Sequence, residues 1–444
     1  MEEKQGFLVM KFGGTSVGST SRIREVAGLI SSDIPKIVVL SAMSGTTNSL
    51  EEYASFLYKQ DKVQARALLA RVKSGYIEVV NKLLQSPEEK QRGIELLESH
   101  FHYLESFNRD MFTLFEEKAV LAQGEMLPTA LMNYFLNEQG ISSIVLPALN
   151  FMRIDKNQEP DEYYIKENLE RELKKYPDVK LFITQGFICR DAFGEIDNLK
   201  RGGSDYTASL LGAAVDAYEV QIWTDIDGFH NNDPRYVKKT KAIRELSFTE
   251  AAELAYFGAK ILHPTSIMPA RQKSIPVRLK NTLNPESHGT LITSAGAKIG
   301  GLKAVAAKDG ITAIRIRSGR MLLAYGFLRK VFEIFESYRT PIDMITTSEV
   351  SVSVTIDQTD HLDEIIKDLE HYANVEIHSD QSIVCVVGDL IAEKEGVARQ
   401  VFNALDDVPV RMISYGSSSN NISILICTKD KIKALNNLSK NLFE

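Results

Sequence analysis

The chain has 444 residues, of which 44% are hydrophobic and 25% are charged, and its formal net charge is −7. This length favours two or three domains with large cores. The negative charge argues against nucleic acid or an anionic membrane surface as the main partner. No apolar run approaches the roughly 18 residues of a membrane helix. The three cysteines, Cys189, Cys385 and Cys427, lie far apart in apolar runs. We therefore expect buried free thiols in a reducing compartment, the cytoplasm.

The first apolar run ends in Lys11, followed by Gly13, Gly14 and two hydroxyl residues. Glycines let the backbone approach a phosphate closely, and N–H groups at a helix start bind anionic oxygens. A lysine beside them supplies positive charge for a phosphoryl group in transfer. The spacing differs from that of P-loops and dinucleotide fingerprints. Taken alone, the motif is explained equally well by a tight strand-to-helix turn with a solvated lysine.

The first two thirds of the chain alternates strand-like and helix-like segments. Short apolar segments indicate buried parallel strands at residues 36–40, 143–146, 180–184 and 220–223. Helix-period stretches between them, such as residues 208–214, predict an open α/β sheet with helices on both faces. Residues from about 50 to 121 are charged and poor in glycine and proline. They predict a helical insertion that serves as scaffold rather than as a site.

An internal repeat follows a glycine-rich boundary near residues 294–301. A glycine, an apolar pair and a Met-Ile pair recur after about 70 residues. The two sets are Gly326, Val331-Phe332 and Met344-Ile345, then Gly396, Val401-Phe402 and Met412-Ile413. Alternating strands in each copy predict two small α+β modules, an arrangement typical of a sensor attached to an enzyme. We expect residues 350–356 to form an edge strand through which two chains pair.

A second glycine cluster contains Arg201, Ser204 and Asp205 and opens an Ala/Leu-rich helix. The positive end of a helix favours an anion, and arginine is suited to hold a carboxylate with two hydrogen bonds. Asp205 has two interpretations. It caps the helix, or it holds nearby lysines in place during phosphoryl transfer.

A third cluster places Thr224 and Asp225 at the end of a strand, where ligands bind in open α/β sheets. These residues suit a nucleotide ring and ribose, and Arg235 suits its phosphates, although a loop without a ligand explains them as well. Lys260 lies between a glycine and apolar residues, so it needs a nucleotide phosphate or a carboxylate as partner. The sequence shows neither a Cys/His cluster at zinc spacing nor a nucleophile elbow.

Hydroxyl residues after the second strand and a carboxylate beyond the insertion suit a small zwitterion. Glu125 is placed to take its amine, and Thr47 and Arg201 its carboxylates. At this point the chain resembles the aspartokinases of the amino-acid-kinase superfamily. The matching stretches run in family order over nearly the whole chain: KFGGTSVG, SAMSGTTN, QGFI with RGGSDYTA, WTDIDGF with DPR, FGAKILHP and ITTSEVSVSVT.

The resemblance is to the single-function, lysine-sensitive type with two C-terminal ACT modules. It implies a catalytic domain over residues 1–295, an open and mainly parallel sheet with helices on both faces and the insertion at about 50–121. A regulatory region over 302–444 would follow, with ACT-like α+β repeats at about 311–385 and 386–444, separate or interleaved.

The implied reaction is ATP-dependent phosphorylation of the β-carboxylate of L-aspartate to 4-phospho-L-aspartate. This is the first step toward lysine, threonine and methionine, with feedback by L-lysine. An ionised carboxylate needs no general base, so catalysis rests on positioning and charge neutralisation. Mg²⁺ is expected on the phosphates of ATP, and no residue is assigned to it. The expected assembly is a homodimer through the ACT modules, with tetramers left open, and neither nucleic acid nor membrane is expected as partner.

The resemblance also implies roles for individual residues. The catalytic residues would be Lys11 and Asp205. The aspartate-binding residues would be Ser41, Thr47, Glu125, Arg201 and Ser204. The ATP-binding residues would be Lys11, Gly13, Gly14, Thr224, Asp225, His230, Arg235 and Lys260. The effector would be bound by Met321, Ala324, Phe327, Leu328, Pro341, Ile342, Asp343, Ser348, Glu349 and Val350.

Departures from the family pattern keep alternatives open. His230 stands where relatives often place tyrosine, and Gln123 where they often place histidine. Leu323 and Ala324 replace a histidine and a serine in the effector pocket. Threonine as effector, or no effector at all, therefore remains an alternative to lysine. A kinase of another acceptor, such as glutamate, carbamate or a nucleotide monophosphate, is the alternative enzyme. A non-catalytic amino-acid sensor is the alternative class, although Lys11, Asp205 and Lys260 are all retained.

Overall fold

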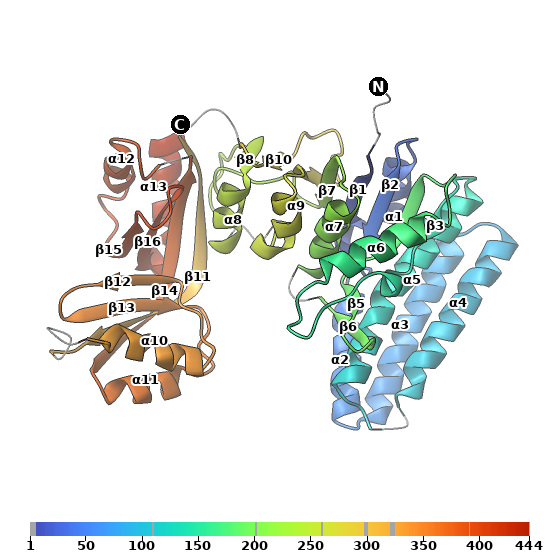
Figure 1. Cartoon of the computed structure of the whole chain (residues 1–444), viewed down its shortest axis with the longest axis horizontal. Coiled ribbons are helices and arrows are strands. Elements are labelled where there is room, and N and C mark those ends of the chain that lie inside the picture. The colour runs from blue at the N-terminus through green and yellow to red at the C-terminus, as the bar shows by residue number, and fades with distance from the viewer. Residues whose placement is uncertain are drawn as a thin grey trace. The chain divides into compact units, whose positions relative to one another are not determined.

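The computed structural model describes residues 6–108, 111–199, 202–258, 261–296, 301–319, 325–389 and 391–443 (Figure 1). The chain forms two compact units. Unit 1 comprises Met1–Gly228, Arg244–Phe248 and Leu262–Gly296, and unit 2 comprises Phe229–Ile243, Thr249–Ile261 and Ala297–Glu444. Two segments that precede the predicted boundary thus group with the C-terminal unit. Within the described ranges, none of the helices combines the length and apolar character needed to span a bilayer.

Unit 1 is built on an eight-stranded sheet in the order β3-β4-β2-β1-β7-β9-β10-β8. Its strands are β1 (Leu8–Phe12), β2 (Lys36–Leu40), β3 (Ile144–Val145), β4 (Leu181–Gln185), β7 (Glu219–Thr224), β8 (Glu245–Ser247), β9 (Val277–Asn281) and β10 (Thr290–Thr293). All pairings are parallel except that of β9 with β10. β2 is buried along its whole length, as expected of a parallel strand covered on both faces. The predicted fold class and the predicted strands are confirmed.

Helices and short turns connect these strands. They are η1 (Gly14–Ser16), α1 (Thr20–Ile30), η2 (Ala148–Asn150), α6 (Glu162–Leu173), α7 (Gly203–Ala214), η3 (Pro264–Ile267) and α9 (Met268–Gln272). A hairpin of β5 (Ile188–Arg190) and β6 (Ile196–Asn198) separates β4 from α7. α1 begins at Ser19, whose hydroxyl accepts the amide hydrogen of Arg22. The parallel order brings the carboxyl ends of β1, β2, β4 and β7 to one edge of the sheet.

The insertion consists of long helices that pack against one another (Figure 1). They are α2 (Thr46–Tyr58), α3 (Lys62–Leu83), α4 (Pro87–Ser106) and α5 (Leu114–Glu138). Asp61 and Ser86 cap α3 and α4, and Thr113 forms a capping box with Glu116 at the start of α5. α5 then continues to the sheet of unit 1, and its residues Gln123 and Glu125 are buried. The insertion therefore ends in a helix that carries a predicted site residue.

Unit 2 contains a six-stranded antiparallel sheet in the order β12-β13-β11-β14-β16-β15. The strands are β11 (Leu302–Arg317), β12 (Met344–Thr347), β13 (Ser351–Ile356), β14 (Asn374–Gly388), β15 (Val410–Tyr415) and β16 (Asn421–Cys427). The other elements are α8 (Phe248–Tyr256), α10 (Phe327–Ser337), α11 (Leu362–Glu370), α12 (Val397–Ala404), η4 (Thr428–Asp430) and α13 (Lys431–Phe443). The long strands β11 and β14 run through both halves of the sheet, with register shifts between Lys308 and Ala313.

The predicted repeat corresponds to equivalent positions in the two halves of this sheet. Gly326 and Gly396 precede α10 and α12 with φ of 89° and 79°, a region that favours glycine. The equivalent residues Val331 and Val401 are buried in separate apolar clusters. Each half therefore has its own small core beneath a pair of helices.

The predicted edge strand is wrong. β13 lies between β12 and β11, and the outermost strands are β12 and β15. An alternating pattern shows that one face of a strand is covered. It does not show whether a neighbour pairs on each side, and the short segment Met344–Thr347 supplies that neighbour here.

The three cysteines are free thiols. Cys189 and Cys385 are buried, and burial raises the pKa of both thiols above the usual value. Cys427 is partly exposed because it is the last residue of β16. The prediction of buried thiols is confirmed for two of the three residues and wrong for Cys427.

Candidate active site

The predicted catalytic lysine and aspartate meet in unit 1. Lys11 lies on β1 and Asp205 in the first turn of α7, and Nζ of the lysine is 2.7 Å from Oδ1 of the aspartate. The two side chains are 13% and 14% exposed, so water screens this pair only partly. α7 begins at Gly202, and no side chain caps it. Of the two interpretations of Asp205, the geometry fits the one in which it holds a lysine in place.

The Gly13-Gly14 turn follows β1 and packs against the loop after β2. A Cβ atom on Gly14 would lie 2.8 Å from the carbonyl oxygen of Ala42, closer than real side chains approach. The Gly14 carbonyl also accepts a hydrogen bond of 3.2 Å from the amide of Ser44. The amide of Gly13 donates to the carbonyl oxygen of Trp223 at 3.3 Å. The N–H of Gly13, predicted to contact phosphate, therefore has a partner within the protein.

Two further glycines make close contacts at the start of α7. A Cβ atom on Gly186, just after β4, would lie 2.5 Å from Cβ and Oγ of Ser204. A Cβ atom on Gly203 would lie 2.5 Å from the ring of Phe187. The amide of Phe187 also donates to the hydroxyl of Thr207 at 3.0 Å. The predicted residue Ser204 is thus held against the carboxyl end of β4, while Arg201 lies outside the described residues.

Glu125 is a buried carboxylate with an unused hydrogen-bonding atom. The residue is 5% exposed, and its Oε2 atom has no hydrogen-bond partner. Burial raises the pKa of Glu125 to about 8, although the charge of Lys11 and a hydrogen bond from the Ala42 backbone oppose this shift. A cationic amine would satisfy the free oxygen and favour the ionised form.

The hydroxyl residues predicted to bind aspartate flank the loop between β2 and α2. Ser41 is half-buried, and its amide donates to the carbonyl oxygen of Phe12 at 3.1 Å, which extends the parallel pairing. Thr47 is half-buried in the first turn of α2, after Gly45 with φ of 82°. Both residues therefore come from the same edge of the sheet as Lys11.

A histidine that the sequence did not indicate supports the neighbourhood of Glu125. Nδ1 of His100, on α4, lies 2.5 Å from Oε1 of Gln123, whose Nε2 donates to the carbonyl oxygen of Ala119. Burial lowers the pKa of His100, and the bond to Gln123 opposes that shift. No local signal marks this pair, because the two residues lie on different helices.

A cavity of about 130 Å³ lies beside the third cluster. It is lined by Thr15, Ser16, Arg22, Asp225, Thr282 and Leu283. The hydroxyl of Thr224 donates to Oδ1 of Asp225 at 3.1 Å, and the hydroxyls of Ser16 and Thr282 are 2.7 Å apart. The motif around Gly13 supplied a signal for Thr15 and Ser16, whereas Arg22 and Thr282 were missed.

The remaining predicted nucleotide residues belong to unit 2. His230 and Arg235 lie in the segment Phe229–Ile243, which we call the nucleotide loop. Nδ1 of His230 is 2.9 Å from the hydroxyl of Thr240. Arg235 donates three hydrogen bonds of 2.6–3.0 Å to Asp233, and these bonds raise the pKa of the guanidinium. Lys260 lies outside the described residues.

The predicted effector residues surround the start and end of β12. Asp343 has a side chain only 2% exposed, and its Oδ1 accepts hydrogen bonds of 2.8 Å from both Lys308 and Tyr256. Lys308 also pairs with Asp357 at 2.8 Å. Oδ2 of Asp343 is buried without a partner. A cation of the protein already occupies one oxygen of this predicted amine site.

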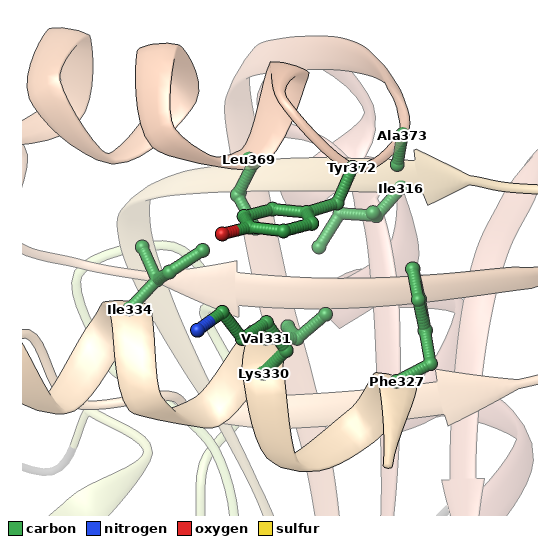
Figure 2. A pocket seen from close by; sticks show the side chains of 8 residues that line it. All are labelled: Ile316, Phe327, Lys330, Val331, Ile334, Leu369, Tyr372 and Ala373. Carbon is green, nitrogen blue, oxygen red and sulfur yellow. The ribbon is translucent and has the colours of Figure 1, made fainter. Parts of the chain in front are cut away.

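Other predicted effector residues are more exposed. Ser348, Glu349 and Val350 form the exposed turn between β12 and β13, Pro341 and Leu328 are exposed, and Ile342 is half-buried. Figure 2 shows an apolar pocket between α10 and α11, which Phe327 lines and where Lys330 lies 5.5 Å from the ring of Tyr372. Met321 and Ala324, like Leu323, lie outside the described residues.

Metal ligands do not gather in the part of the chain that the structure describes. No group of three or more His, Cys, Asp or Glu side chains there is arranged to hold an ion. Two carboxylates near the site have partners within the protein. Asp205 pairs with Lys11, and Asp225 accepts from Thr224.

Comparison with known proteins gives matches over nearly the whole chain. Residues 6–281 match the amino acid kinase family, and residues 384–442 match an ACT domain. The lysine-sensitive aspartokinase 3 of Escherichia coli is 33% identical, an alignment that covers 98% of this chain and 99% of the relative. The solved structure of E. coli aspartokinase III with aspartate and ADP, in the R-state, superimposes with a TM-score of 0.84 and covers 99% of this chain and all of that one. The structure with lysine and aspartate, in the T-state, gives a TM-score of 0.82 at the same identity and coverage.

Proposed function

The chain belongs to the aspartokinases of the amino acid kinase family, and on that premise we propose which of its groups transfer a phosphoryl group from ATP to L-aspartate. The observation that carries the proposal is the Lys11–Asp205 pair at the carboxyl edge of the sheet. The charge of Lys11 also acts on the buried carboxylate of Glu125. A cation for the phosphoryl group and an anion for the substrate amine are therefore both supplied at this site.

Lys11 would neutralise the phosphoryl group during transfer. An oxygen of the β-carboxylate attacks the γ-phosphorus, the bond to the bridging oxygen breaks, and ADP leaves with the electron pair. No proton is removed, because the attacking carboxylate is already ionised at neutral pH. Asp205 holds the ammonium of Lys11 in a fixed position, so little reorganisation is needed as charge develops.

Glu125 would bind the ammonium group of aspartate. Its free Oε2 atom needs a donor, and an ammonium supplies both a hydrogen bond and a compensating charge. Since burial raises the pKa of this carboxyl to about 8, much of it carries a proton at neutral pH before substrate arrives. Ser41, Thr47, Ser204 and Arg201 would bind the carboxylates.

ATP would be bound by the residues that the sequence indicates, which we describe for each unit by itself. In unit 1, the turn at Gly14 and the cavity beside Asp225 offer hydroxyls and backbone groups. His230 and Arg235 would contribute from the nucleotide loop, with Lys260. Mg²⁺ would be coordinated mainly by phosphate oxygens and water. The ion would share with Lys11 the neutralisation of the phosphates.

Regulation would reside in the C-terminal unit. The matched ACT domain covers residues 384–442, and the repeat of Gly326 and Gly396 supports a second module before it. We infer L-lysine as effector, with its amine directed to the free Oδ2 atom of Asp343. Pairing of two chains through the outer strands β12 and β15 would give a homodimer, with tetramers as a further step. Free thiols are consistent with a cytoplasmic location.

The test is acyl-phosphate formation trapped as hydroxamate. The full chain with ATP, Mg²⁺ and L-aspartate should give hydroxamate, and Lys11→Met should not. L-Glutamate in place of aspartate is the control for the acceptor. Millimolar L-lysine should suppress the signal. Activity unaffected by lysine would remove the effector proposal only, and equal activity with glutamate would overturn the assignment of the acceptor.

A further inference from the structure

The nucleotide loop is a closed and anchored segment of unit 2. The amide of Ile243 donates to the carbonyl oxygen of Phe229 at 2.7 Å, and the amide of Asn231 donates to that of Lys241 at 2.9 Å. The amide of Val305, on β11, donates to the carbonyl oxygen of Asn231 at 2.9 Å. These bonds close the base of the loop and fix it to the sheet that carries the ACT domain.

Helix α13 holds the tip of the same loop. The amide group of the buried Asn232 side chain donates to the carbonyl oxygen of Leu435 at 3.0 Å. Val237 belongs to the apolar cluster formed by Ala434, Leu438 and neighbouring strands. The side chains next to His230 and Arg235 are thus packed on the last helix of the chain.

Lys431 joins the loop, the helix and the sheet. The residue is 6% exposed, and its Nζ atom lies 2.6 Å from Oδ2 of Asp309 and 4.1 Å from the ring centroid of Tyr236. Oδ1 of Asp309 accepts a 2.7 Å hydrogen bond from Ser382 on β14. A desolvated cation held by an aspartate and a ring has little freedom, so it fixes Tyr236, the residue that follows Arg235.

We propose that Lys431 is a positioning residue for ATP. It acts through Tyr236 on the nucleotide loop and touches neither nucleotide nor aspartate. The inference rests on the proposed role of His230 and Arg235 in ATP binding. It predicts that disturbing the last helix of the chain weakens ATP binding, whereas the aspartate-binding groups of unit 1 are unaffected.

The experiment compares two lysines of one helix in the full chain. Lys431→Met removes the buried charge and keeps the length of the side chain. Lys433→Met is the matched control, because Lys433 is 49% exposed and pairs with Asp407 at 2.8 Å. We expect KM for ATP to rise about tenfold in Lys431→Met, a change of about 1.4 kcal/mol. KM for aspartate should stay within about twofold of the wild-type value. Lys431→Arg should recover most of the affinity for ATP. ADP binding measured by calorimetry should show the same loss and the same recovery.

Three outcomes decide the proposal. Equal KM values for ATP in Lys431→Met and Lys433→Met overturn it, and so does an equal rise in KM for ATP and for aspartate. If Lys431→Met fails to fold, Tyr236→Leu tests the same link while leaving the ion pair with Asp309 intact, and an unchanged KM for ATP there overturns it. Arg235→Ala separates the two proposals, because an unchanged KM for ATP in that variant refutes the role of the loop while Lys11-dependent activity persists.

Discussion

Two segments proposed to contact ATP, the turn at Gly14 in unit 1 and the nucleotide loop in unit 2, are held by different kinds of contact. In unit 1, the turn at Gly14 is packed so closely against the Ala42 backbone that no Cβ atom fits. In unit 2, backbone hydrogen bonds close the base of the nucleotide loop, and side-chain contacts with Leu435 and Lys431 hold the rest of it. Backbone packing leaves a single arrangement, whereas side-chain bonds break and re-form with modest changes in free energy. The unit that carries the ACT domain thus holds the adjustable part.

The largest effect should come from removing the charge of Lys11 in unit 1. Lys11→Met leaves Asp205 without its partner and removes the charge beside the transferred phosphoryl group. We expect kcat to fall by about 10³-fold, with little change in KM for ATP. Steady-state kinetics with saturating Mg-ATP measures this. A loss below about fivefold would mean that the phosphoryl group is neutralised elsewhere.

The steric part of the comparison is tested by two neighbouring glycines. Gly14→Ala places a Cβ atom 2.8 Å from the Ala42 carbonyl oxygen, whereas the nearest atom for Gly13→Ala is Nζ of Lys11 at 3.5 Å. We expect Gly14→Ala to lower the free energy of unfolding by about 1–3 kcal/mol, with a much smaller loss for Gly13→Ala. Urea denaturation of both variants gives the difference. Equal losses would show that the loop after β2 moves freely and that backbone packing does not fix this turn.

The charge of Glu125 should depend on pH in a defined window. Its pKa is about 8 in the folded chain and 4.5 without the protein environment, so the folded state binds the proton more tightly. The free energy of unfolding should therefore fall as pH rises from 4.5 to 8 and level off above. Aspartate binding at pH 7 should release a proton, because the substrate ammonium favours the ionised carboxylate.

Calorimetry in two buffers of different ionisation enthalpy measures that proton. Glu125→Gln should bind aspartate about tenfold or more weakly, release no proton and lose the stability slope between the two pKa values. A wild-type binding enthalpy that does not depend on the buffer would show that Glu125 is ionised before aspartate arrives.

The smallest predicted effect concerns the binding of the effector to unit 2. Lys308 donates to one oxygen of Asp343, and Lys308→Met removes this competing cation while Tyr256 still donates to the same oxygen. If an effector amine uses Asp343, L-lysine should bind about threefold to tenfold more tightly to this variant. Lys330→Met, at an exposed position over Tyr372, is the control. Weaker lysine binding in Lys308→Met would show that Lys308 positions Asp343 for the effector instead of competing with it.

Local sequence patterns predicted the parallel strands well, because buried strands such as β2 are continuous apolar runs. They did not indicate β9, where Arg278 and Lys280 alternate with apolar residues near the end of the sheet. The repeat predicted the symmetry of unit 2. It did not predict that β12 would pair with the edge of β13 that we expected to be unpaired.

The motifs predicted which residue types the site contains, and the fold brings Lys11 and Asp205 into contact. Contacts between residues distant in sequence carried no signal. Three such contacts are hydrogen bonds: the amide of Gly13 with the carbonyl oxygen of Trp223, His100 with Gln123, and Lys308 with Asp343. The paired residues are 210, 23 and 35 positions apart, and a local sequence pattern does not encode which distant residues meet. The roles of the site residues in binding stay predictions.

The register shift in β11 has a mechanical consequence. Lys308 and Asp309 are adjacent there, just before Gly310 with φ of 75°. Lys308 bonds to the carboxylate of Asp343, and Asp309 bonds to Lys431 beneath the nucleotide loop. Both side chains leave the strand at this register shift, where a strand bends and its twist increases. A change in the local twist would therefore alter the directions of both side chains, so we expect the contacts of Asp343 and Lys431 to change together.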